Sequence, residues 1–433
     1  MASLNVLIIG GGIAGPAAAY WLSRIPGARI KLIERSSQKR VSGQQIDLRV
    51  AGLDIMRKMG IEPAVRAVRC KEPGTQLVDT DGRTVAYFPA AAHGSGRQSL
   101  TSEYEIMRGD LVGILYRLTE DRDNVRHVFD TTVRDFTQDD EADPDGKVHV
   151  TFSDGAREDF DLVLAADGTG SRTRRLLLGP DAPDPRHRTG GYVGFFSVPP
   201  QPWDSDRGTL CVLPGTRMAR TLMTRKDCAE VTRVGVILGA RDAAVDAALE
   251  AGDVAAQKRA LADVLEGGGW ETERFMGALL SAPEADDLYC TPFEEVRLPE
   301  GDWSRGRVVL LGDAAHSATA NGYGTSWALI GPYLLAGELA TLYERDKALP
   351  PASIVQAARN YEKMWRPTAL AGHGDGWLAS LFPPRSALGI HILNRVVGVA
   401  AYLRLDQYIG FDGAVGKWKL PDYPALDKDQ GAD

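Results

Sequence analysis

The sequence predicts an α/β protein in which a Rossmann-type domain is interrupted by an inserted, mainly antiparallel β-sheet domain and is followed by a C-terminal helix. Three observations predict it. A glycine-rich turn at residues 10–15 directly follows the apolar run 4–9, and a second glycine segment at 312–324 follows Arg307 and the apolar residues 308–311. Residues 190–240 are rich in β-type residues and are broken by Pro199-Pro200 and Pro214-Gly215.

The first glycine turn is typical of a loop that binds a pyrophosphate. Gly10 permits a tight turn out of the strand, Gly12 allows the backbone to approach the phosphates, and Gly15 lets the following helix pack closely on the strand. Phosphate is expected on the free N–H groups of Ile13 and Ala14, at the positive end of that helix. The alternative is a glycine turn in a βαβ unit that binds no ligand.

An acidic residue follows the second predicted strand, residues 29–33. Glu34 stands where a carboxylate accepts hydrogen bonds from an adenosine ribose and disfavours a 2′-phosphate. Glu34 and the adjacent Arg35 are therefore candidate cofactor contacts. The alternative for Glu34 is a solvated strand end.

Length and composition limit the class of protein. The chain has 433 residues, 44% of them hydrophobic and 25% charged, which is enough for a large core and two lobes. The net charge of −8 gives no reason to expect a nucleic-acid partner. Four scattered cysteines form neither a disulfide framework nor a zinc set, so we expect no metal and a reducing, cytoplasmic location.

No segment predicts a membrane span. The N-terminal apolar residues belong to the first strand, so we do not expect them to be a signal peptide. The apolar stretch 388–405 is interrupted by His391, Asn394, Arg395 and Arg404. Its helical spacing favours a helix packed across two lobes. Attachment to a membrane surface is the alternative, which we do not expect. Without an obvious interface stripe, we expect a monomer.

The remaining elements follow from local patterns. Residues 4 to about 70 read as strand, helix, strand, loop and helix, and residues 75–89 as a hairpin around Asp81-Gly82. A helix is expected at 109–119, and strands at 124–128, 132–136, 148–152 and 161–165. Helical stretches are expected at 241–265 and 270–282, and the tail from about 422 is polar.

These elements define the expected domains. The first domain is expected to comprise residues 1–72, 101–180 and 288–372. The inserted substrate domain is expected to comprise the hairpin 73–100 and residues 181–287. A bridging helix and tail are expected over 373–433.

A third motif lies between the two glycine segments. Residues 161–174 form a strand that ends in Asp167-Gly168, with Ser171 and Arg174 at fixed offsets. This segment resembles the "DG" fingerprint of the class A flavoprotein monooxygenases, and the other two signatures of that family flank it in the right order. Residues 106–111 resemble the family's arginine segment. The resemblance spans residues 4 to about 345, and residues 40–48 look most like the tetracycline-inactivating monooxygenases and related natural-product hydroxylases.

The resemblance implies a glutathione-reductase-like FAD fold and a role for each matching residue. Glu34 would hold the adenosine ribose, and Arg108 would contact the ribose and pyrophosphate. Asp313 would bind the ribityl or pyrophosphate region. Asp167 would serve both the flavin and its reductant. The turn formed by Gly322, Gly324, Thr325 and Ser326 would bring backbone N–H groups to the edge of the flavin ring.

Residues 40–48 would lie beside the flavin. The resemblance places Asp47, with Gln45, near the ribityl chain or the ring, and Arg40 near the route of the nicotinamide donor. The second glycine segment departs from the family pattern, because Thr319-Ala320 replaces the usual Pro-Pro and the turn is one residue shorter. We still expect a helix from Gly324, with Thr325 or Ser326 as its cap.

The implied reaction is that of an FAD enzyme. NADPH or NADH would reduce the flavin, O₂ would form a C4a-hydroperoxide, and one oxygen atom would hydroxylate or epoxidise a bulky aromatic or polycyclic natural product. Such chemistry belongs to the cofactor, while the protein positions the substrate and excludes water.

Two residues are catalytic candidates. Asp47, beside Gln44 and Gln45, would orient substrate or move a proton, although a purely flavin-binding role is the alternative. Arg217 is expected on a strand over 217–225, on the face of Arg225 and opposite Arg220, where it would recognise a phenolate or carboxylate; solvated faces are the alternative. His316 is interpreted as structural. Three candidates for the pocket wall are equally compatible with core: Tyr192, Phe195 and Met223.

Rival functions share the fold or part of it. A flavin-dependent halogenase of this type carries a WxWxIP segment, and none of the eight tryptophans stands in one. A prenyl reductase stays open as an alternative. A flavin-fold binding protein without catalysis would be expected to have damaged phosphate loops. A plain NAD dehydrogenase would not explain Gly312-Asp313.

Overall fold

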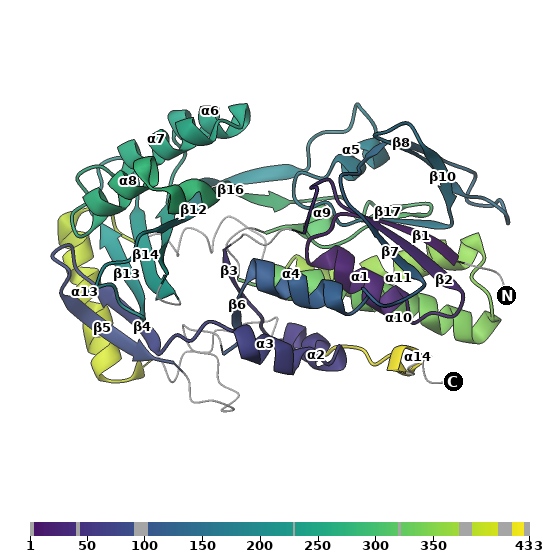
Figure 1. Ribbon diagram of the computed structural model, residues 1–433, viewed down its shortest axis with the longest axis horizontal. Coiled ribbons are helices and arrows are strands. Elements are labelled where there is room, and N and C mark those ends of the chain that lie inside the picture. Colours follow the sequence, from purple (N-terminus) through teal and green to yellow (C-terminus); the bar gives the residue numbers. More distant parts are fainter. Residues whose placement is uncertain are drawn as a thin grey trace.

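The computed structural model describes residues 4–39, 44–90, 103–227, 230–318, 322–371, 383–405 and 418–427. Figure 1 shows two lobes joined by long strands. One lobe, here called the Rossmann lobe, is built on a six-stranded sheet, and the other, the sheet lobe, on a seven-stranded sheet. Arg40 lies outside the described residues, as do Thr319 and Ala320.

The Rossmann lobe contains the parallel sheet that the sequence predicts. Its strand order is β17-β18-β11-β1-β2-β7, and the pairs are parallel except for β17 with β18. The strands are β1 (Leu4–Ile9), β2 (Ala28–Ile33), β7 (Val125–Val128), β11 (Leu162–Ala165), β17 (Ser304–Arg305) and β18 (Val308–Leu310). The central strands are apolar runs because helices cover both faces of the sheet.

Helices surround this sheet. All nine residues of α1 are buried, since the helix lies between the sheet and α10. The helices of the lobe are α1 (Ala14–Leu22), α2 (Ala51–Lys58), α3 (Glu62–Val68), α4 (Arg108–Arg117), α5 (Arg172–Leu178), α9 (Asp313–His316), α10 (Gly324–Asp346) and α11 (Pro351–Ala369). Two small antiparallel sheets complete it: β3 (Gln45–Asp47) with β6 (Glu105–Met107), and β8 (Val133–Gln138), β9 (Val148–Phe152) and β10 (Arg157–Phe160).

The sheet lobe is mainly antiparallel, in the order β16-β12-β15-β14-β13-β4-β5, with β13 and β4 parallel. Its strands are β4 (Gly74–Val78), β5 (Thr84–Pro89), β12 (Arg186–Val198), β13 (Gly208–Leu213), β14 (Arg220–Asp227), β15 (Val231–Leu238) and β16 (Tyr289–Val296). One face packs on α6 (Ala243–Ala251), α7 (Val254–Leu265) and α8 (Thr272–Ser281), with the 3-10 helix η1 (Pro283–Asp287) beside them. The fold class predicted from the sequence is confirmed.

Two boundaries differ from expectation. The strand expected from Arg217 begins at Arg220, because the chain turns through Pro214-Gly215 and the following residues. The segment 288–372 was expected in the first domain, yet β16 pairs with β12 and belongs to the seven-stranded sheet. Its far end forms a bridge from Glu295 to Ala318, so this strand runs between the lobes.

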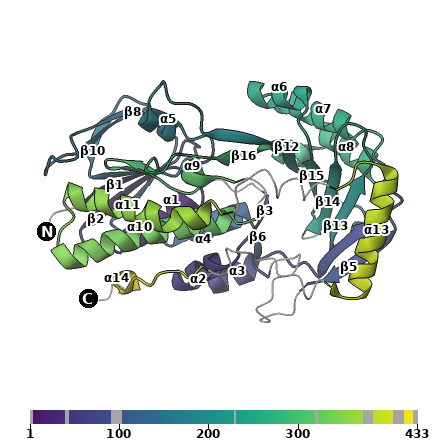
Figure 2. The same ribbon diagram turned by 180° about the vertical axis from the view of Figure 1, so that it is seen from behind.

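The C-terminal part of the chain packs on both lobes. Helix α13 (Ala387–Tyr402) packs on β5 of the sheet lobe, and α14 (Pro424–Asp427) packs on α10 of the Rossmann lobe. Figure 2 shows α13 at the outer side of the sheet lobe and the C-terminus near α14, far from it. The Tyr423 hydroxyl donates to Glu338 at 2.8 Å, which fixes the returning chain.

Candidate functional site

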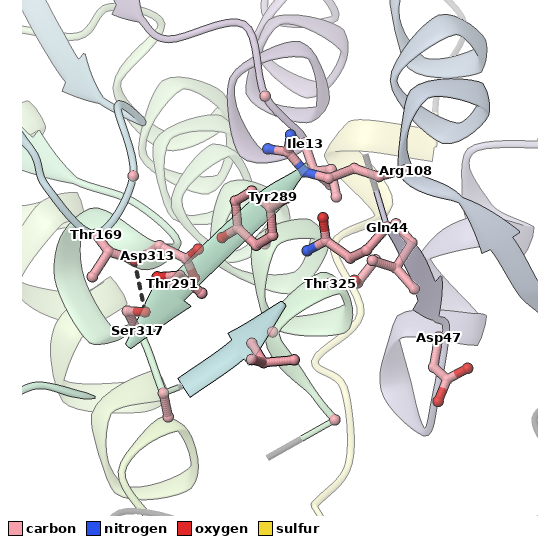
Figure 3. A pocket seen from close by; sticks show the side chains of 18 of the residues that line it. Ile13, Gln44, Asp47, Arg108, Thr169, Tyr289, Thr291, Asp313, Ser317 and Thr325 are labelled. Carbon is pink, nitrogen blue, oxygen red and sulfur yellow. Dashed lines mark hydrogen bonds between the residues drawn. The ribbon is translucent and has the colours of Figure 1, made fainter. Parts of the chain in front are cut away.

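A cavity of about 460 Å³ lies where the two lobes meet. Gly12, Arg108 and Asp313 line it from the Rossmann lobe, and Phe195, Met223 and Tyr289 from the sheet lobe. Figure 3 shows Arg108, Gln44 and Tyr289 pointing into it, with Asp313 and Thr291 toward one end and Asp47 at the other. Its volume is in the range of cofactor and small-molecule sites.

The first glycine loop has the geometry that the motif predicts. Gly10 has a φ of +112°, and a Cβ there would lie 2.4 Å from the carbonyl oxygen of Ala166. A Cβ on Gly15 would lie 1.9 Å from the carbonyl oxygen of Gly10. Gly12, Ile13 and Ala14 line the cavity, and α1 starts there without a side-chain cap. The free N–H groups at this helix end therefore face the cavity and suit an anion.

Glu34 stands at the end of β2, as expected, and its carboxylate stabilises the glycine loop. One oxygen accepts from the Gly11 N–H at 2.8 Å and the other from the Ser36 N–H at 3.0 Å. Burial, reinforced by the charge of Glu34, raises the pKa of the nearby Tyr116 hydroxyl. Arg35 is exposed. The loop and strand end thus form one hydrogen-bonded unit.

The DG motif holds the loops of the site together. The Asp167 carboxylate accepts hydrogen bonds from the Ser171 hydroxyl and, at 3.1 and 3.0 Å, from the Thr173 N–H and hydroxyl, so it faces the start of α5. Arg174 is buried and donates to the carbonyl oxygens of Thr169 at 2.6 Å and Ala314 at 2.8 Å. Burial lowers the pKa of Arg174. Arg174 therefore connects the DG motif to the second glycine segment.

Replacing Arg174 is expected to loosen the site as a whole. Arg174→Met removes two hydrogen bonds and leaves the carbonyl oxygens of Thr169 and Ala314 without this donor, so we expect a loss of about 3 kcal/mol in the free energy of unfolding. The adjacent Arg175→Met, on the exposed side of α5, is the control and should change stability by less than about 0.5 kcal/mol. Urea unfolding of both variants tests this, and equal stabilities would contradict the assigned role.

The second glycine segment contributes a carboxylate. Gly312 has a φ of +57° and Asp313 begins α9. The side chain of Asp313 opens toward the cavity, and the protein around the cavity raises its pKa by desolvation while the Arg108 guanidinium acts to lower it. His316 is buried among Trp303, Trp327 and Trp365 and accepts from Trp365 Nε1 at 3.3 Å. This placement agrees with the structural interpretation of His316.

The turn before α10 supplies three of its four expected residues. Gly322, Gly324 and Thr325 line the cavity. Ser326 is buried and exchanges hydrogen bonds of 2.9 Å with the backbone N–H and carbonyl of Arg49, so it joins α10 to the start of α2. The expected cap is wrong, because Tyr323 stands at the N-cap and no side chain caps α10. Free N–H groups are thereby left at this helix end.

A pair of short strands forms another wall. Gln44, Gln45 and Asp47 line the cavity, and Asp47 on β3 stands opposite Glu105 on β6. Arg49 pairs with Oδ2 of Asp47 at 2.7 Å. Within the described residues, Oδ1 of Asp47 and Oε2 of Glu105 are buried without a hydrogen-bond partner. This wall therefore places two carboxyl groups next to each other.

Glu105 is a candidate that the sequence interpretation missed. Desolvation first, and then the charges of Asp47 and Glu72, raise its pKa well above the usual range of a carboxyl group. Burial also raises the pKa of Glu72, which is hydrogen-bonded to Glu105 and lies near the Arg225 guanidinium. Two carboxyl groups in such contact share a proton. The sequence signal that could have identified Glu105 is its position, three residues before Arg108.

The wall from the sheet lobe follows strand alternation. Val193, Phe195, Met223 and Ile237 point into the cavity from three neighbouring strands. Tyr192 is on the opposite face of β12, where its hydroxyl donates to Asp246 at 2.9 Å. Phe195 and Met223 are therefore pocket residues, and Tyr192 is a core residue.

The arginines of the sheet lobe lie elsewhere than expected. Arg217 is in the loop before β14, is 79% exposed, and pairs with Asp242 at 3.5 Å. It lines a second cavity of about 910 Å³ with Arg220 and Arg385. The prediction that Arg217 shares a strand face with Arg225 is wrong. The alternative, in which these arginines lie on solvated faces, is wrong for Arg220 and Arg225, because both side chains are buried. Arg220 donates to the carbonyl oxygen of Val264 at 2.8 Å.

The cavity fits an extended dinucleotide. Uncapped N–H groups at the starts of α1 and α10 lie at its wall, and Arg108 and Asp313 stand on the same wall. The loops close only because glycines stand at positions 10 and 15. An apolar sheet face closes the other side. Such a site binds a cofactor and presents it to a second molecule.

Comparison with known proteins shows the family of this chain. The FAD binding domain family matches residues 3–224. The flavin-dependent monooxygenase eupH of a Phoma species is 41% identical over 430 residues, which cover 98% of each chain. The FAD-dependent monooxygenase asL4 of Sarocladium schorii is 37% identical over 451 residues, 99% of this chain and 100% of the relative. The tetracycline destructases Tet(51) and Tet(55), at 26% and 28% identity, superpose with TM-scores of 0.71 and 0.73 over 97% of this chain and 99% of theirs.

The fold and the site define a flavoprotein oxidoreductase with FAD as its cofactor. The chain belongs to the class A FAD-dependent monooxygenases.

Proposed function

We propose that this enzyme consumes NADPH or NADH and O₂ to hydroxylate or epoxidise a bulky aromatic or polycyclic natural product. In the hydroxylation, one oxygen atom of O₂ enters the substrate and the other leaves as water, while NAD(P)H supplies two electrons. The observation that carries the proposal is a single cavity with phosphate-binding loops on one wall and an apolar sheet face on the other. FAD, when bound, would supply the electron transfer and the activation of oxygen.

The residues of the Rossmann lobe would bind and orient the cofactor. N–H groups of Gly12 to Ala14 would hold the pyrophosphate, with Arg108 and Asp313 beside it. N–H groups of Gly324 and Thr325, at the uncapped start of α10, would face the ring edge, where donors stabilise negative charge. Asp167, whose carboxylate is engaged at α5, would act by fixing the loop.

The sheet wall supports an aromatic or polycyclic substrate. Val193, Phe195, Met223 and Ile237 offer apolar contact over a broad surface, and such surfaces also exclude water from the reacting atoms. Tyr289 and Thr291 add hydroxyl groups that would orient a polar substituent. The name of the tetracycline destructases states that they act on a tetracycline, which is a polycyclic natural product, and a role in secondary metabolism is in keeping with this.

A bulkier side chain at position 223 is expected to impair substrate binding selectively. Met223→Trp narrows the cavity from the sheet side, and we expect KM for a polycyclic substrate to rise about tenfold while the FAD content stays unchanged. Steady-state kinetics with a large and a small phenol test this. An equal effect on both substrates would contradict the assignment of Met223 to the substrate wall.

We assign proton transfer to the wall formed by β3 and β6, which carries Asp47 and Glu105. Oxygenation of a phenol moves protons at the substrate hydroxyl, and Glu105, whose pKa is raised by burial and by the charge of Asp47, lines the cavity. We assign the proton to Glu105, with Glu72 as the group that shares it. Asp47, paired with Arg49, would orient the substrate.

Arg217 lines the second cavity, so no catalytic role is proposed for it. On the resemblance alone, Arg40 would lie near the route of the nicotinamide donor.

The test is turnover in labelled oxygen. The holoenzyme is mixed with NADPH or NADH, ¹⁸O₂ and a panel of polycyclic phenols, and products are analysed by mass spectrometry. One ¹⁸O atom per product molecule and faster NAD(P)H oxidation with one candidate are expected. A chlorinated or brominated product in the presence of halide, or a reduced prenyl chain without incorporated oxygen, would instead identify a halogenase or a prenyl reductase.

A further inference from the structure

Helix α13 leaves an apolar face toward solvent. Its inward side, with Ile390 buried and Leu393 and Val397 half-buried, packs on β4, β5 and β13. The large residues on its other side, and two that directly follow the helix, are from 42% to 87% exposed. Seven of the thirteen large hydrophobic side chains classed as exposed among the described residues stand here: Leu388, Ile392, Val396, Val399, Tyr402, Leu403 and Leu405.

These side chains form a continuous stripe. Leu388, Ile392 and Val396 follow at intervals of four, and Val399 and Leu403 continue the same side of the helix. No other stretch of the described chain gathers exposed apolar side chains in this way. Scattered exposed hydrophobic residues need no explanation, but a contiguous patch marks an interaction surface.

The charge of this segment is opposite in sign to that of the whole protein. Residues 383–405 contain Arg385, Arg395 and Arg404 and no aspartate or glutamate, whereas the whole chain has a net charge of −8. All three arginines and His391 are exposed. Tyr402, at the end of the stripe, is the type of amphipathic aromatic residue found at membrane interfaces. An exposed apolar stripe flanked by arginines is typical of a helix that lies in an anionic lipid surface.

We propose that the exposed face of α13 docks on an anionic phospholipid membrane, with the helix axis parallel to the surface. Leu388, Ile392, Val396 and Val399 enter the headgroup region, and the arginines contact lipid phosphates. No helix in the described part of the chain is long and apolar enough to span a bilayer, so the contact is peripheral. This inference goes beyond the proposed reaction and does not depend on it.

A second copy of the chain fits this face less well. Sixteen helical residues are about 24 Å long and present a strip about 10 Å wide, a footprint well below the ~800 Å² per partner of a stable dimer. A paired helix would also bring positive side chains together without any carboxylate from residues 383–405. Lipid phosphates supply the missing negative charge.

Vesicle sedimentation of the full-length holoenzyme tests the proposal. Wild type is expected to sediment with vesicles of equal phosphatidylcholine and phosphatidylserine, and at least tenfold less with phosphatidylcholine alone or in high salt. Ile392→Glu with Val399→Glu is expected to weaken binding at least tenfold. The matched control is Val254→Glu with Leu280→Glu, two exposed hydrophobic residues on α7 and α8, and it should bind like wild type.

Several outcomes would overturn the proposal. These are no sedimentation of wild type, equal binding to both kinds of vesicle, or unchanged binding of the α13 variant. A dimer in light scattering that the α13 variant dissociates would show a second copy as the occupant. The FAD absorbance per chain and the turnover of the α13 variant are expected to match wild type, which separates failure of docking from failure of the proposed function.

Discussion

Gly15→Ala is expected to give protein that does not retain FAD, whereas Gly113→Ala is expected to retain it. Both glycines stand in helices, α1 and α4. A Cβ on Gly15 would lie 1.9 Å from the carbonyl oxygen of Gly10, while one on Gly113 meets only the end of the Arg117 side chain at 3.6 Å. The first substitution must push α1 away from the phosphate-binding loop, because two backbone segments cannot occupy the same space.

The two variants are compared by flavin absorbance per chain and by chemical unfolding. We expect Gly15→Ala to lose at least tenfold in FAD affinity and about 1–3 kcal/mol in stability, as overpacked sites do. Gly113→Ala is expected to be as stable as wild type or about 0.5–1 kcal/mol more stable, since alanine favours helix. Normal FAD content in Gly15→Ala would show that the close approach of helix and strand is not required.

Glu105→Gln is expected to reduce turnover about a hundredfold while leaving FAD bound, because the amide keeps the shape of the side chain but cannot give up a proton in the same way. Glu103→Gln is the matched control. Glu103 lies two residues earlier and pairs with Arg66 at 3.0 Å instead of lining the cavity. Difference infrared spectroscopy supplies a readout other than activity: wild type at neutral pH should show a protonated carboxyl band that Glu105→Gln lacks. The absence of that band from wild type would contradict the assignment.

The raised pKa of Glu105 also predicts a dependence of stability on pH. The folded protein holds a proton that the unfolded chain releases above about pH 4.3. The folded state is therefore penalised as pH rises from that value toward the higher pKa of the folded state. Glu105→Gln does not titrate, so its stability relative to wild type should increase over this window. Urea unfolding at several pH values measures the difference, and a constant difference would contradict the raised pKa.

The local features of the site were predictable from the sequence. Gly10, Gly15 and Asp167-Gly168 are recognisable because a turn, a close helix packing and a strand end each need a particular residue at a fixed spacing. The parallel strands were predictable from their apolar runs. Asp313 and Arg108 were found through the family pattern, and both line the cavity.

Features that depend on distant contacts were not predictable. Glu105 meets Glu72 only because β6 and the segment before β4 fold together, and no local pattern reports this contact. Ser326 was expected at the cofactor, but the fold places Arg49 within 2.9 Å of its hydroxyl. Arg217 was placed on a strand by alternation, yet the chain turns until Arg220. The strand β10 was missed because Arg157–Phe160 has only one apolar residue and is ordered by pairing with β9.

The most direct test of the account is the absorbance spectrum of the purified protein, followed by anaerobic addition of NADPH or NADH with and without polycyclic phenols. We expect the bands of oxidised flavin at one FAD per chain, bleached faster when one of the phenols is present. Such a result would indicate that the cofactor, the reductant and the phenol all act at the same cavity. A colourless protein that cannot be reconstituted with FAD would contradict the assignment of the site, and bleaching that no phenol accelerates would contradict the proposed substrate class.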